Sequence, residues 1–77
     1  MRHARPDYDR IQDPAGLIPK DEPVFIIRAQ DVSSGDAVRA WADLNDANRG
    51  DPRASNLARE HADQMDAWPI KKPADLP

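Results

Sequence analysis

The chain has 77 residues, no cysteine and a formal net charge of −3 at pH 7, with 14 acidic and 11 basic side chains. Domains this short bury only about 60% of the surface that their unfolded chain exposes, so their margin of stability is small. Without cysteine, and with only two histidines, neither a disulfide nor a closed zinc site can reinforce the fold. The acidic balance argues against duplex nucleic acid as a partner, because phosphate binding needs a basic surface. We therefore expect one small domain over residues 1–77 that gains stability from self-association or from a partner.

The sequence shows neither a secretory signal nor a membrane-spanning segment. Residues 1–10 are polar and lack the apolar core of a signal peptide. No run approaches the roughly 18 apolar residues that cross a bilayer. We expect a cytoplasmic protein that contacts no membrane and binds no cofactor.

The first 22 residues are predicted to form an extended, proline-rich arm. Proline removes a backbone donor and restricts the residue before it, which disfavours a regular helix. The prolines of residues 1–23 are Pro6, Pro14, Pro19 and Pro23, the last of which begins the predicted strand.

One short β-strand is predicted at about residues 23–29, within a segment of residues 23–30. Val24 to Ile27 are four consecutive apolar residues of β-branched and aromatic type, which indicates burial on both faces. A lone strand leaves its backbone groups unpaired, so it must pair either with the arm or with the same strand of a second copy. This requirement is the main reason to expect a homo-oligomer.

Two helices are predicted at about residues 35–48 and 52–68, joined in an antiparallel hairpin over residues 34–68 and followed by a proline-rich tail over 69–77. Gly50 is expected to take the left-handed conformation after the first helix, and Asp51 and Pro52 to start the second. Apolar side chains at three- and four-residue spacing predict that the helices pack against each other. The predicted packing faces are Ala37, Ala40, Trp41, Leu44 and Ala47 in the first helix, and Ala54, Leu57, Ala58, His61, Met65 and Trp68 in the second.

The predicted fold class is therefore α+β, mostly α, in one domain. We find no internal repeat.

A candidate ligand site lies where the predicted strand turns polar. Arg28 and Gln30 share a strand face with Val24 and Ile26, and a buried guanidinium needs an anionic partner. That partner is either an internal carboxylate (Asp31, Asp21 or Glu22) or the phosphate or carboxylate of a ligand. In the second case the arm completes a polar and aromatic pocket that stacks a base, and the ligand-binding residues are Tyr8, Arg10, Gln12, Arg28 and Gln30.

No pattern predicts catalysis or a metal site. The aspartates at positions 7, 9 and 13 lack the loop of a calcium site, because Ile11 and Gln12 stand where an oxygen ligand and glycine are needed. His61 falls on an apolar helix face, where we expect a packing role. No serine or carboxylate has a context that marks it as the partner of a catalytic base. We expect a protein that is not an enzyme.

Two stretches of the sequence resemble short accessory proteins encoded by phages and prophages of proteobacteria. They are PDYDRIQDP at residues 6–14 and DEPVFIIRAQD at residues 21–31, and the likeness extends to the first helix and to residues 71–76. The resemblance implies no catalytic residue. It implies stoichiometric action in the host cytoplasm, where such proteins block a host protein or sequester a small immune signal.

Two functions follow from these expectations. The first is sequestration of an anionic small ligand, such as a nucleotide immune signal, as a counter-defence. The alternative is a protein interaction module that binds a host or virion protein and takes no small-molecule ligand.

Overall fold

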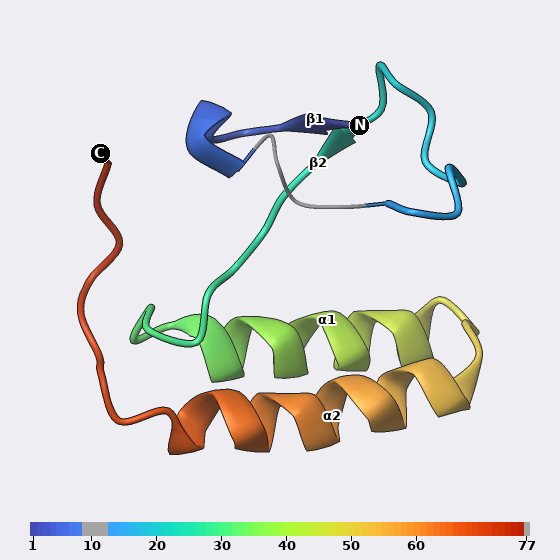
Figure 1. Ribbon diagram of the computed structural model, residues 1–77. Helices are drawn as coiled ribbons and strands as arrows, with labels where there is room; N and C mark the ends of the chain where they lie inside the picture. The colour runs from blue at the N-terminus through green and yellow to red at the C-terminus, as the bar shows by residue number, and fades with distance from the viewer. Residues whose placement is uncertain (9–12, 77) are drawn as a thin grey trace. The chain divides into compact units, whose positions relative to one another are not determined.

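The computed structural model describes residues 1–8 and 13–76. The chain divides into two compact units, a terminal unit of Met1–Ile27 with Asp75–Pro77 and a hairpin unit of Arg28–Ala74. The fold consists mostly of two helices, together with a two-stranded parallel sheet (Figure 1). Neither helix has the length and apolar character that crossing a bilayer requires.

The sheet of the terminal unit pairs the two ends of the N-terminal arm region. Strand β1 (Arg2–His3) runs parallel to strand β2 (Pro23–Val24), with His3 opposite Val24. The Arg2 amide donates to the Glu22 carbonyl at 2.7 Å. Of the two pairings that the sequence left open, the structure thus shows pairing with the arm. The arm is also less extended than predicted, because a short 3-10 helix, η1, occupies Pro6–Tyr8.

The predicted strand over residues 23–29 is much shorter than expected. Regular pairing ends at Val24, because β1 offers only two residues as a partner. The prediction that Val24 to Ile27 are buried on both faces is wrong, since the Phe25 side chain is 74% exposed.

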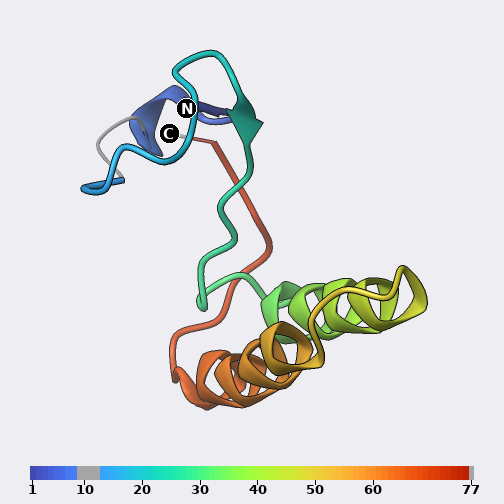
Figure 2. The same cartoon turned by 90° about the vertical axis from the view of Figure 1, so that its right-hand side faces the viewer.

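The hairpin unit contains the two predicted helices, α1 (Ser34–Ala47) and α2 (Pro52–Ala67). They lie side by side in both views, and α2 runs back along α1 (Figures 1 and 2). Asp51 caps α2 as predicted, because its side chain accepts the Arg53 amide at 2.9 Å. Pro52 is the first helical residue, where its missing N–H costs no hydrogen bond.

The turn between the helices differs from the prediction. Arg49 takes the left-handed conformation, with φ of 59°, and Gly50 does not. Glycine is favoured at position 50 for another reason. The Asn45 side chain occupies the space of a Cβ atom there, while its amide nitrogen donates to Ser55 Oγ at 2.9 Å.

The helices pack through small side chains. Ala42 of α1 and Ser55 and Ala62 of α2 are fully enclosed, and Met65 is buried beside them. Small residues let two helix axes approach closely, so the seam between the helices is narrow. Met65 is the only member of the predicted packing faces among the buried apolar residues of this unit.

Most of the predicted packing face is therefore wrong. The large members Trp41, Leu44, Leu57 and Trp68 are at least half exposed, and His61 is also exposed. The prediction assumed that the largest apolar side chains form the core. In this hairpin the small side chains face the other helix instead, because charged pairs flank the small-residue seam and fix how the two helices are rotated.

The segment before α1 is tied to the tail. Lys72 donates its amide to the Gln30 carbonyl at 2.8 Å and accepts from the Val32 amide at 3.0 Å. This makes an isolated parallel bridge between Asp31 and Lys72. Part of the predicted strand end thus pairs with the proline-rich tail.

Candidate functional site

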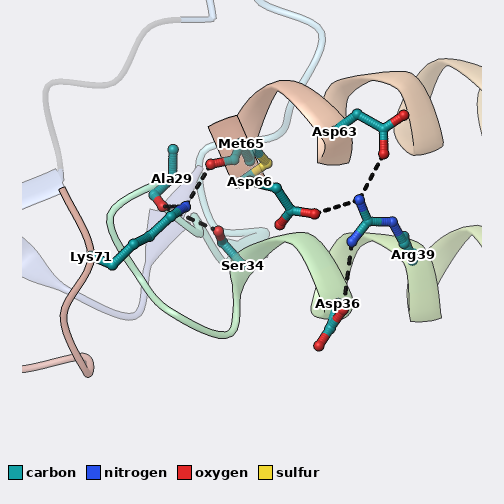
Figure 3. A network of polar contacts seen from close by, with 8 residues as sticks. All are labelled: Ala29, Ser34, Asp36, Arg39, Asp63, Met65, Asp66 and Lys71. Carbon is teal, nitrogen blue, oxygen red and sulfur yellow. Dashed lines mark hydrogen bonds and ion pairs between the residues drawn. The ribbon is translucent and has the colours of Figure 1, made fainter. Parts of the chain in front are cut away.

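Two carboxylates of α2 hold the Arg39 side chain of α1. Its Nη2 atom donates to Asp63 Oδ1 at 2.7 Å and to Asp66 Oδ2 at 2.6 Å (Figure 3). A longer contact of 3.5 Å reaches Asp36, one turn earlier in α1. The hydrogen bonds to Asp63 and then to Asp66 raise the pKa of Arg39 above its ordinary value. The guanidinium of arginine stays charged in proteins, so the clamp joins a cation to two carboxylates.

Arg59 of α2 is held in the same way by α1. Its Nη2 atom donates to Asp46 Oδ2 at 2.6 Å and to Asp43 Oδ1 at 2.9 Å. A hydrogen bond with Ser55, and then the one from Arg59, lower the pKa of Asp46 below its ordinary value. Both clamps have partly exposed members, so each contributes modestly to stability, but together they form a network across the seam.

The two clamps repeat one sequence spacing. In each helix an arginine is followed by aspartates four and seven residues later: Arg39, Asp43 and Asp46 in α1, and Arg59, Asp63 and Asp66 in α2. The two sets lie 20 residues apart in the sequence, and the same 20 residues separate the seam residues Ala42 and Ala62. The helices thus share a short repeat, contrary to the expectation of none. The polar spacing was the available signal, whereas apolar periodicity does not show it.

Lys71 ties the segment before α1 to the end of α2. Its ammonium donates to the Met65 carbonyl at 2.6 Å and to the Ala29 carbonyl at 2.7 Å (Figure 3). The Ser34 hydroxyl also donates to the Ala29 carbonyl, at 3.3 Å. A cation is favourable at a helix C-terminus, where carbonyl groups lack helical partners. This network makes residues 28–31 a defined part of the hairpin unit.

The hairpin leaves large apolar side chains in solvent. Their exposed fractions are 50% for Trp41, 61% for Leu44, 67% for Leu57 and 50% for Trp68. Isolated exposed apolar residues are normal on proteins, but contiguous patches mark interaction surfaces. Whether these four residues share one side of the hairpin therefore decides their meaning.

Helical geometry places them opposite the clamps. At about 100° per residue, Trp41 lies on the flank of α1 away from Asp43, with Leu44 further round. In α2, Leu57 and Trp68 lie on the flank away from the clamp residues by the same count. No Asp, Glu, Lys or Arg of the two helices falls in this sector. We call this surface the apolar face; its members are Ala37, Trp41, Leu44, Ala54, Leu57, His61 and Trp68.

A second feature lies at the start of the hairpin unit. Arg28, Ala29, Gln30 and Trp68 line an open depression of about 310 Å³. Arg28 is exposed, and its guanidinium has no ion-pair partner within the described part of the chain. The inference that Arg28 is a buried cation is thus wrong, because the strand that would bury it ends at Val24.

The predicted ligand residues are distributed over both units. The structure brings Arg28 and Gln30 together and adds Trp68, which the sequence assigned to the helix core. Tyr8 belongs to the terminal unit, where the Arg5 guanidinium lies 4.7 Å from the centre of its ring. Arg10 and Gln12 lie outside the described residues. Within the described part, no three acidic or histidine side chains gather where they could hold a metal ion.

No family model, no curated protein and no solved structure matches the chain. The apolar face and the depression beside Arg28 are therefore the two surfaces from which a function can be inferred.

Proposed function

We propose that the chain is a non-catalytic accessory protein of the phage type, which acts stoichiometrically by binding a protein partner through the apolar face. The observation that carries the proposal is that four large apolar side chains are each at least half exposed and lie, by helical position, on a side of the hairpin where α1 and α2 place no charged residue. An amphipathic helical surface of this kind buries its apolar stripe against a complementary apolar surface.

Charge on the hairpin supports the same assignment. The clamp side carries five carboxylates against two guanidinium groups. Because these groups pair with one another across the seam, they keep that side hydrated and leave it less suited to burial. The uncharged side can lose water without stranding a charge.

Site-specific photocrosslinking in cells tests the surface. A photoreactive phenylalanine analogue at Leu57, on the apolar face, is expected to give a defined crosslink to protein. The same analogue at the neighbouring Asn56, which is exposed on the clamp side, is expected to give none. Equal crosslinking at both positions, or none at either, would contradict the proposal.

A second candidate function rests on the depression beside Arg28. We propose that it takes a small anionic ligand that carries an aromatic ring, such as a nucleotide signal. Arg28, which has no ion-pair partner among residues 1–8 and 13–76, offers its guanidinium to a phosphate, and the half-exposed Trp68 indole offers a stacking face. The volume of about 310 Å³ is at the lower end of the range of ligand pockets.

This candidate is tested by titrating nucleotides into a Trp41→Phe chain, so that Trp68 alone reports binding. We expect a saturable change in fluorescence that Arg28→Ala abolishes and that Arg53→Ala, remote in sequence from the depression, leaves intact. A response that survives Arg28→Ala would remove the ligand site.

A further inference from the structure

We infer that the partner of the apolar face is a second copy of this chain, and that two hairpins form a four-helix bundle. The inference rests on the proposed function, because it names the occupant of the same surface. The prediction from the strand gave a different reason for self-association, and that reason is lost, since β2 pairs with β1 of the same chain.

The hairpin unit has a small apolar core. Within the hairpin unit, the buried apolar side chains of the described residues are Ala42, Ala62 and Met65. Chains of this length draw little stability from one core and depend on a further staple. The chain has no cysteine for a disulfide. A second hairpin laid on the apolar face would turn four exposed large side chains into core.

The apolar face offers enough apolar area for a small dimer interface. Half-exposed tryptophans offer about 125 Å² each, from about 250 Å² for a full side chain. Leucines that are about two-thirds exposed offer about 80 Å² each, because full burial of a leucine side chain corresponds to about 120 Å² of apolar area. The face thus offers about 400 Å² of apolar surface per copy, and about 800 Å² in a pair. Stable interfaces bury about 1,200 to 2,000 Å² in total, of which about 65% is apolar in homodimers.

The pair therefore reaches the lower limit of a stable dimer. Alanine and the His61 side chain at its edge add to the area.

The distribution of charge also favours contact between two apolar faces. Two clamp sides would repel each other, because each carries more carboxylates than guanidinium groups. Two apolar faces have less conflict, since the helices place no acidic or basic residue there, and Arg28, which lines a depression with Trp68, adds a single positive charge at one end. A two-fold dimer joins identical patches, so the uncharged side is the one that can meet its own copy.

Sedimentation equilibrium of the full chain over a wide concentration range tests the inference. We expect the mass to rise from 8.6 kDa to twice that value as concentration increases. Leu57→Glu should weaken association about 100-fold or more, because it buries an unpaired carboxylate. Asn56→Glu, the matched control on the clamp side, should associate like the natural chain. Leu44→Lys serves as a second variant on α1, and helical circular dichroism verifies that each variant folds.

Acrylamide quenching of Trp41 and Trp68 separates the ways in which the inference can fail. A monomer at all concentrations with readily quenched indoles would overturn the dimer while leaving a free surface for another protein. A monomer with shielded indoles would overturn both the dimer and the proposed function. A dimer that Leu57→Glu does not weaken would show that the copies meet elsewhere and would also overturn the inference.

Discussion

At the scale of single residues, the polar side chains decide the local geometry of the hairpin. Asn45 fills the space beside Gly50 and bridges to Ser55, so it fixes the turn between the helices. Lys71 satisfies carbonyl groups at the end of α2 and before α1. Arg49 alone among the described non-glycine residues has a positive φ, and this conformation costs about 1 kcal/mol for a side chain with a Cβ atom.

Replacing Arg49 with glycine is therefore expected to stabilise the hairpin. Relief of the left-handed strain outweighs the added freedom of the unfolded chain, which leaves a gain of about 0.5 kcal/mol. Urea unfolding followed by helical circular dichroism measures the change. Asn48→Gly is the control, because Asn48 has a φ of −88° and gains nothing from glycine. A loss of stability in Arg49→Gly equal to that of the control would contradict this account.

At the scale of the helices, the seam is selected by what fits between two closely spaced backbones. Ala42 and Ala62 are fully buried there, and the arginine clamps lie along one edge. Each clamp joins one guanidinium of one helix to two carboxylates of the other, so sliding or rotating either helix would break several charge-assisted hydrogen bonds together. The large apolar residues are consequently turned outward.

Enlarging the seam tests this packing. Ala62→Leu is expected to lower the free energy of unfolding by about 1 to 3 kcal/mol, because a fully enclosed site has no room for three more carbon atoms. Ala67→Leu, at an exposed position of the same helix, should change it little. Thermal unfolding of both variants gives the comparison. If Ala62→Leu were as stable as the natural chain, the seam would have to lie on another face.

At the scale of the whole molecule, the distribution of charge matters more than the net value of −3. Acidic groups concentrate on the clamp side of the hairpin, where they pair with arginines across the seam. The opposite side carries the apolar face. The hairpin unit is thus amphipathic, with the clamps on one side and the apolar face on the other.

This arrangement predicts loss of stability in acid. The pKa of Asp46 is lowered by Ser55 and then Arg59, and that of Asp51 by Arg53. A lowered pKa means that the folded state binds these protons less readily than the unfolded state, so the stabilisation is complete above the unfolded value of about 3.9. The melting temperature should be flat above about pH 5 and should fall as the pH drops below about 4.

Calorimetry across this range measures the effect, and Asp46→Asn should flatten the decline, because residue 46 then no longer titrates. A melting temperature that rises on acidification below about pH 4 would contradict the role of the carboxylates.

The sequence by itself determined the two helices and the start of α2, because capping and proline rules act within a few residues. Asp51 and Pro52 start α2 where expected. Each of the other three helix ends differs from its predicted position by one residue. The short strand was located in the right region, although its length was not. These features depend on local chemistry, which a single sequence contains.

Only the tertiary structure decided which sides of the helices meet and which groups surround Arg28. Apolar periodicity gives an apolar side for each helix, but not whether that side faces the other helix or a partner. Here the burial of the small side chains Ala42 and Ala62, together with the arginine clamps, determined the rotation. Arg28 was exposed for a related reason, because strand pairing ends where β1 ends. Both outcomes depend on contacts between residues far apart in the chain, and local pattern does not encode them.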